Sequence, residues 1–86
     1  MTKDEALRRI KEQLGEVLAV QPAEIADDAL LVEDLGVSSM EIVQIYVYFQ
    51  ELGVPMADSF NLHESMSVST LADRVVEAAA EQDADR

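Results

Sequence analysis

The sequence has no cysteine, so neither a disulfide nor a thiolate metal site can hold the fold together. A reducing compartment such as the cytoplasm fits this composition. No apolar run is long enough to cross a bilayer, and the first residues lack the apolar stretch of a signal peptide. These absences predict a small cytoplasmic protein whose own apolar core stabilises it and which does not enter a membrane.

Positive charge is missing from the middle of the chain. Residues 12–73 contain no lysine or arginine, and the net charge is −12. The same stretch carries twelve carboxylates: Glu12, Glu16, Glu24, Asp27, Asp28, Glu33, Asp34, Glu41, Glu51, Asp58, Glu64 and Asp73. A field of this sign repels nucleic acid and anionic lipid, and it attracts proteins that carry basic docking patches. We therefore expect protein partners, with no nucleic acid and no membrane.

The 86 residues predict one all-α domain over residues 1–86, built as a small four-helix bundle of three main helices and one short helix. The first helix spans residues 3–19, with Thr2 as N-cap and the Glu5 side chain reaching back to it. The last helix spans residues 68–81, with Ser67 or Ser69 as cap and a frayed tail over 82–86. Residues expected to face inward on this last helix are Val68, Leu71, Val75 and Ala78 or Ala79.

A long connection over residues 20–37 separates the first two helices. Its apolar residues are too numerous for a free loop, and we expect them to fold onto the core: Ile25, Leu30, Leu31, Val32 and Leu35. The short helix is expected near residues 62–65.

The second helix begins with Ser38-Ser39-Met40-Glu41, which matches a capping box with Ser38 as N-cap and Glu41 at the third helical position. Ser39 is then free to point to solvent from the first helical position. The core stripe is predicted to be Ile42, Ile45, Phe49 and Leu52, with Gly53 after the helix end. A second stripe contains Ser39, Val43, Val47 and Gln50, flanked by Met40 and Tyr46, so an apolar face lies beside Ser39.

Catalysis by Ser39 finds no support in the sequence. The single histidine, His63, lies in a polar segment and would have to serve as the base. The acidic loop around Asp27-Asp28 and Glu33-Asp34 lacks the ligand pattern of a calcium-binding loop, so we predict no metal site. The remaining alternatives are a helix-start serine without a role, an acidic interaction module that needs no cofactor, and a serine modified by another protein.

The segment Leu35-Gly36-Val37-Ser38-Ser39-Met40 resembles the Leu-Gly-x-Asp-Ser-Leu signature of acyl carrier proteins. The resemblance covers nearly the whole chain, including the closing Val68–Val75 segment. It implies that a phosphopantetheinyl transferase attaches a 4′-phosphopantetheine arm to Ser39 and that the arm's thiol carries acyl groups as thioesters. The spacing to Gly36 favours Ser39 over Ser38 as the acceptor.

The same resemblance implies a carrier rather than an enzyme, and nothing in the sequence demands more than a monomer. Its partners would be acyl-loading and acyl-processing enzymes with basic docking patches. Helix two would be the surface that these partners contact, through Met40, Glu41, Val43, Val47 and Glu51.

Departures from the family pattern bear on the pathway. Ser38 replaces the usual aspartate and removes a negative charge, and Met40 replaces leucine. Gln44 and Gln50 stand where the fatty-acid type tends to be acidic, and Ile42, Tyr46 and Tyr48 make this helix more apolar than is expected for that type. These features favour a stand-alone carrier of polyketide or related secondary-metabolite biosynthesis, with an aminoacyl carrier or a fatty-acid carrier as alternatives.

Overall fold

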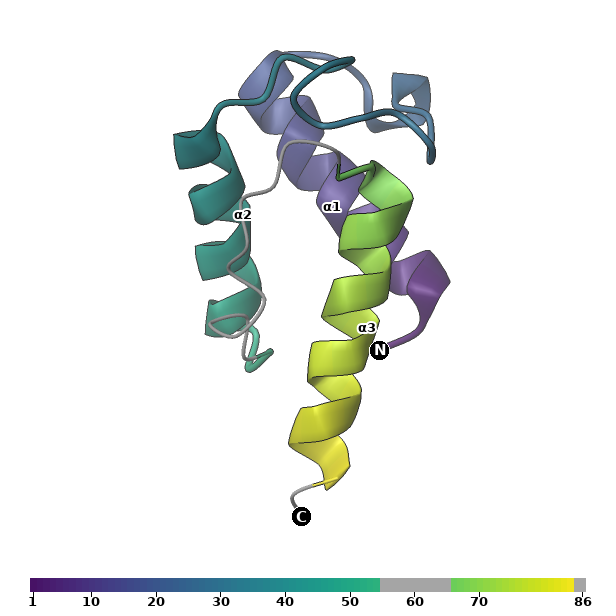
Figure 1. Ribbon diagram of the computed structural model, residues 1–86, viewed down its shortest axis with the longest axis vertical. Helices are drawn as coiled ribbons and strands as arrows, with labels where there is room; N and C mark the ends of the chain where they lie inside the picture. Colours follow the sequence, from purple (N-terminus) through teal and green to yellow (C-terminus); the bar gives the residue numbers. More distant parts are fainter. Residues whose placement is uncertain (55–65, 85–86) are drawn as a thin grey trace.

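The computed structural model describes residues 1–54 and 66–84, the last four as backbone only. The described part contains three α-helices, α1 (Lys3–Leu18), α2 (Ser39–Glu51) and α3 (Val68–Ala84), and the short 3-10 helix η1 (Pro22–Glu24). Helix α1 packs against α2, α3 and η1, and the long connection crosses one end of the bundle (Figure 1). The all-α prediction is confirmed, whereas the predicted helix at 62–65 lies outside the described residues.

Helix α1 begins and ends within one residue of its predicted bounds. The Thr2 hydroxyl accepts a hydrogen bond from the Glu5 N–H at 3.2 Å, so the predicted N-cap is confirmed. The Glu5 carboxylate does not complete a capping box. It accepts bonds from Nε and Nη2 of Arg9, each at 3.2 Å, because a cation four residues on is a favoured partner on a helix surface.

Large apolar side chains from all three α-helices and the connection form one core. Fully buried members include Ile10, Leu14, Leu31, Ile45, Tyr46, Phe49, Val68, Leu71 and Val75. On α3 the predicted inward residues are all buried, and the Thr70 N–H donates to the Ser67 hydroxyl at 3.1 Å, which identifies Ser67 as the cap. Helix α3 extends through residues 82–84, which were predicted to be frayed, because no glycine or proline interrupts it there.

Three apolar residues lie differently from their predicted positions. Tyr46 is fully buried, because Ile42, Ile45, Tyr46 and Phe49 share one helical face at spacings of three and four residues. Leu52 is 46% exposed, because it caps the helix and no longer follows the helical stripe. Val32 is 42% exposed, because it lies on the outer side of the turn that buries Leu31.

Backbone hydrogen bonds join the long connection to the start of α3. The Leu31 N–H donates to the Met66 carbonyl at 2.9 Å, and the Val68 N–H donates to the Ala29 carbonyl at 3.0 Å. The Ser69 N–H donates to the Asp27 carbonyl at 2.8 Å. These bonds satisfy backbone groups that folding takes out of water, and they explain how so long a connection is held on the core.

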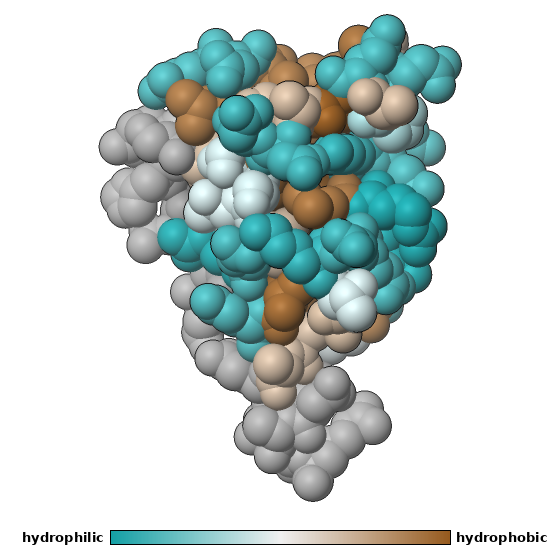
Figure 2. Space-filling view, turned by 90° about the vertical axis from the view of Figure 1, so that its right-hand side faces the viewer, coloured by the Kyte–Doolittle hydropathy of each residue, from teal (hydrophilic) through white to brown (hydrophobic). Residues whose placement is uncertain are grey.

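Arg9 joins α1 to α2. Its Nη1 donates to the Tyr48 hydroxyl at 3.1 Å, and this bond, together with the bonds to Glu5, raises the pKa of Arg9. The Tyr48 ring in turn meets Phe49 edge to face, with ring centroids 5.1 Å apart. On the face shown in Figure 2, the side of the molecule away from α2, hydrophilic side chains predominate among the described residues and apolar areas lie between them.

Candidate functional site

The N-terminus of α2 is closed by the predicted capping box. The Glu41 N–H donates to the Ser38 hydroxyl at 3.2 Å, and the Ser38 N–H donates to the Glu41 carboxylate at 2.8 Å. Ser38 has an extended backbone, with φ −82° and ψ 164°, and Ser39 is the first helical residue. The cap therefore uses the Ser38 and Glu41 side chains and leaves the Ser39 side chain outside it.

The turn that leads into α2 is closed by its own hydrogen bonds. The Leu30 N–H donates to the Asp34 carboxylate at 2.9 Å, and the Val37 N–H donates to the Leu31 carbonyl at 2.8 Å. Gly36 adopts a left-handed backbone with φ +68°, a conformation that L side chains rarely take. Val37 is buried, so the chain enters α2 from a fixed point on the core.

Ser39 is exposed at this fixed helix start. Within the residues that the structure describes, no hydrogen bond engages its hydroxyl. The unpaired N–H groups and the dipole at the helix start favour a negatively charged group there. The arrangement suits an anionic ester on the Ser39 oxygen.

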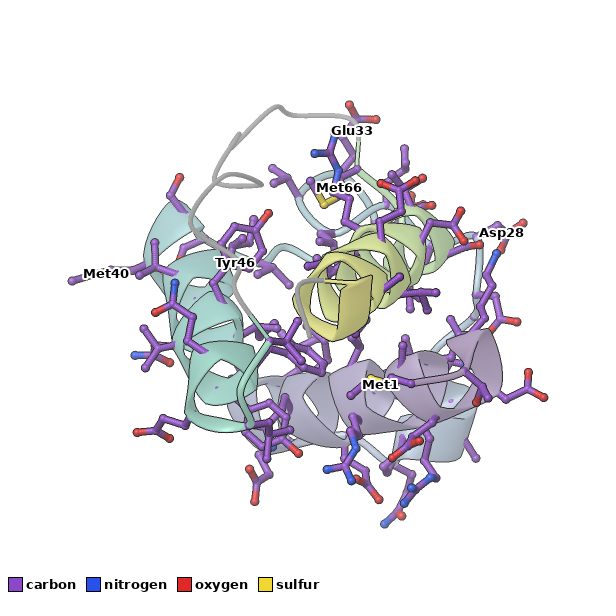
Figure 3. All side chains as sticks on the ribbon, turned by 90° about the horizontal axis from the view of Figure 1, so that it is seen from below. Met1, Asp28, Glu33, Met40, Tyr46 and Met66 are labelled. Carbon is purple, nitrogen blue, oxygen red and sulfur yellow. The ribbon has the colours of Figure 1, made fainter. Side chains whose placement is uncertain are left out.

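An apolar face lies next to Ser39 on α2. Met40 is 76% exposed, Val47 is 46% exposed and Val43 is half-buried between them. Figure 3 shows Met40 pointing away from the bundle and Tyr46 on the opposite side of α2, towards α3. Glu41 is half-buried by the cap and Glu51 is exposed near the helix end, so the apolar stripe has carboxylates beside it.

No catalytic or metal-binding group accompanies Ser39 in the described part of the chain. His63, the only histidine, lies outside that part, and no cluster of three or more histidine, aspartate or glutamate side chains is found within residues 1–54 and 66–84. In the acidic loop, Asp27 pairs with Lys11 and Asp34 caps Leu30, so both carboxylates have structural partners. None of the described helices is long and apolar enough to cross a membrane.

The sequence did not lead us to expect that Tyr46 of α2 and Arg74 of α3 lie near each other between these two helices. Burial raises the pKa of the Tyr46 hydroxyl, and the positive charge of Arg74 on α3 lowers it in part. The spacing of Tyr46 from Ile42 could have indicated its burial, whereas no sequence signal places Arg74 beside it.

A family model and several relatives of known type all point to one protein family. The family model described as "Phosphopantetheine attachment site" matches residues 8–75. The chain is 37% identical over 59 residues to an acyl carrier protein of Petrotoga mobilis. The aligned segment covers 67% of this chain and 69% of that protein. It is 28% identical over 75 residues to an acyl carrier protein of Thermotoga maritima, covering 86% of this chain and 88% of the relative.

A third relative, an acyl carrier protein of Zymomonas mobilis, is 35% identical over 51 residues, covering 58% of this chain and 65% of that protein. No solved structure matched significantly.

The matched family model fits the geometry at the start of α2. Proteins of this family carry a covalently attached 4′-phosphopantetheine cofactor, whose phosphate is the kind of anionic ester that a helix start favours. When bound, the cofactor supplies a thiol that this cysteine-free chain lacks. Such a protein is a non-catalytic carrier that interacts with a phosphopantetheinyl transferase and with acyl-processing enzymes. This chain belongs to the acyl carrier protein family.

Proposed function

We propose that Ser39 is the attachment residue and that the chain presents acyl groups on an arm anchored there. One observation carries this assignment: Ser38 forms the helix cap, so the neighbouring Ser39 hydroxyl is exposed at the helix start. In the transfer, the Ser39 oxygen bonds to the phosphorus of the phosphopantetheine unit. The phosphoanhydride bond of coenzyme A breaks, the nucleotide leaves, and the hydroxyl proton passes to a base of the transferase.

Adjacent serines offer a matched test of this proposal. The protein is incubated with coenzyme A and a broad-specificity transferase, and its intact mass is measured. We expect the wild type and Ser38→Ala to gain one phosphopantetheinyl group and Ser39→Ala to gain none. Loss of the cap in Ser38→Ala costs about 1 kcal/mol, which leaves the domain folded. Equal modification of Ser39→Ala would refute the assignment, and partner binding that survives in that variant would favour an acidic module without cofactor.

We propose that the face formed by Met40, Glu41, Val43, Val47 and Glu51 is the docking surface for enzymes with basic patches. Its support is the combination of exposed apolar side chains with carboxylates beside the attachment residue. Methionine suits contact with several partners because its side chain is flexible and polarizable.

Two exposed valines allow a controlled test of the docking surface. Val47 is 46% exposed on α2, and Val20 is 40% exposed after α1. We expect Val47→Asp to raise the KM of the transferase for the protein by at least about tenfold, because it would place a carboxylate without a partner in the apolar part of the interface. Val20→Asp is expected to leave the KM unchanged. Equal effects of the two substitutions would exclude a docking role specific to α2.

We further propose a monomeric, cytoplasmic carrier of polyketide or related secondary-metabolite assembly. The support is the apolar character of α2, with Gln44 and Gln50 where a more acidic face is expected for a fatty-acid carrier. Mass analysis of the loaded protein isolated from its native host would identify the cargo. A simple alkyl chain would indicate the fatty-acid alternative, and an amino acid the aminoacyl alternative.

A further inference from the structure

Asp34 bonds to both backbone groups of Leu30 across the turn that precedes α2. The Leu30 N–H donates to the Asp34 carboxylate at 2.9 Å, and the Asp34 N–H donates to the Leu30 carbonyl at 3.0 Å. The Leu35 N–H donates to the same carbonyl, also at 3.0 Å. Among the described residues, this carboxylate is the one side chain that hydrogen-bonds to the backbone of residues 30–37. Its acceptor is charged, which makes the bond stronger than one between neutral groups.

The first residue of this turn is fixed to the start of α3. Leu30 forms an isolated β-bridge with Ser67, and the Leu31 N–H donates to the Met66 carbonyl at 2.9 Å. The Leu31 side chain is fully buried. Asp34 therefore bonds to a segment that the core and a second part of the chain hold in place.

The last residues of the turn lead directly to Ser39. The Gly36 N–H donates to the Val32 carbonyl at 3.1 Å, and the Val37 N–H donates to the Leu31 carbonyl at 2.8 Å. Gly36 is exposed and has a φ of +68°, and a glycine backbone adds little restraint of its own. Only one residue separates Val37 from Ser39. A change in the closure of the turn is therefore passed to the start of α2 and to the Ser39 hydroxyl.

We propose that Asp34 is a positioning residue for the modification of Ser39, because its carboxylate holds the turn in the conformation that presents the Ser39 hydroxyl to the transferase. The proposal rests on attachment of the arm to Ser39. Transfer requires the serine oxygen to approach the phosphorus of coenzyme A in a defined geometry, and a displacement of about 1 Å can slow such a step about a hundredfold. The proposed docking surface lies on α2 after Ser39, so loss of the Asp34 bond should lower kcat and leave KM nearly unchanged.

Glu33 provides the matched control for Asp34. The two carboxylates are adjacent and exposed, but Glu33 forms no hydrogen bond or ion pair with any described residue. Alanine at either position removes one negative charge from the same turn, whereas only Asp34→Ala also removes the bond to Leu30. Asp34→Asn removes the charge and keeps an oxygen that can accept the Leu30 N–H, so it separates the bond from the charge.

Initial rates of transfer from coenzyme A are measured by intact mass over a range of carrier concentrations. We expect Asp34→Ala to lower kcat about tenfold, with KM within about twofold of the wild type, because one hydrogen bond to a charged group is lost. Asp34→Asn and Glu33→Ala should keep kcat within about twofold, because both retain a bond to the Leu30 N–H. Hydrogen exchange of the Leu30 amide should be faster in Asp34→Ala and remain slow in the other two variants. Asp34→Leu has the shape of asparagine without an acceptor, and it replaces Asp34→Ala if that variant fails to fold.

Three results would overturn the positioning role. They are equal kcat in Asp34→Ala and Glu33→Ala, an equal loss of kcat in Asp34→Asn although its Leu30 amide stays protected, and an effect confined to KM, which would assign Asp34 to docking. A wild type that gains no mass would instead refute attachment at Ser39, and the positioning role would be lost with it. A modified wild type with the same kcat in Asp34→Ala would refute the positioning role alone.

Discussion

Replacing Leu31 by alanine tests whether the long connection is part of the core. The Leu31 side chain is fully buried, although its segment is neither helix nor strand. Truncation removes three carbon atoms, worth about 2.4 kcal/mol of burial at about 0.8 kcal/mol per group. The cavity left behind adds to this cost, and we expect about 3–4 kcal/mol in total. A domain of this size has about 4–13 kcal/mol of stability, so the loss is a large fraction of it.

The neighbouring Val32 provides the control. It belongs to the same turn but is 42% exposed, so Val32→Ala is expected to change the free energy of unfolding by less than about 0.5 kcal/mol. Urea unfolding followed by circular dichroism measures both variants. The midpoint for Leu31→Ala should fall by about 1–3 M with little change in slope. A difference between the two variants below about 1 kcal/mol would refute the inference that this connection is packed into the core.

Three further predictions concern backbone geometry and pH. Gly15→Ala should destabilise the protein, because the new Cβ would lie 2.8 Å from the Val20 carbonyl oxygen. Alanine in place of glycine usually stabilises a helix by about 1 kcal/mol, so a raised melting temperature of this variant would contradict the predicted clash. Gly36→Ala should cost about 1–2 kcal/mol in urea unfolding because φ is +68°, and a neutral result would show that the turn can rearrange. Burial raises the pKa of Tyr46 above its unfolded value of 10.0, so the stability contributed by its neutral form is present below pH 10 and is lost as pH rises further. Alkaline unfolding should therefore move to higher pH in Tyr46→Phe, and an unchanged alkaline midpoint in that variant would exclude this cause.

Local interactions made much of the fold predictable. The Ser38–Glu41 capping box is set by residues three apart, so its sequence pattern placed the start of α2 correctly. The prediction of Thr2 as N-cap was correct for the same reason. The prediction that the Glu5 side chain reaches back to the cap was wrong, because this carboxylate accepts hydrogen bonds from Arg9 instead. Both outcomes come from contacts within one turn of a helix.

Tertiary contacts were harder to predict. Leu31 and Val32 are adjacent apolar residues, and the sequence pattern does not distinguish them. The geometry of the turn decides that Leu31 is buried and Val32 is exposed. The bonds from residues 27–31 to the start of α3 join backbone groups, which leave no trace in side-chain patterning. At the site, the exposure of Ser39 followed from local capping, while the approach of Arg74 to Tyr46 depends on how two helices pack.

The ion pairs are distributed unevenly over the helices. The four cations of α1 neutralise carboxylates on α1, the long connection and α3, and no cation lies on α2. Exposed pairs of this kind add little stability. Because α2 carries no cation, its two carboxylates, Glu41 and Glu51, form no ion pair with any described residue. A helix without positive charge beside Ser39 agrees with the proposed docking of enzymes that carry basic patches.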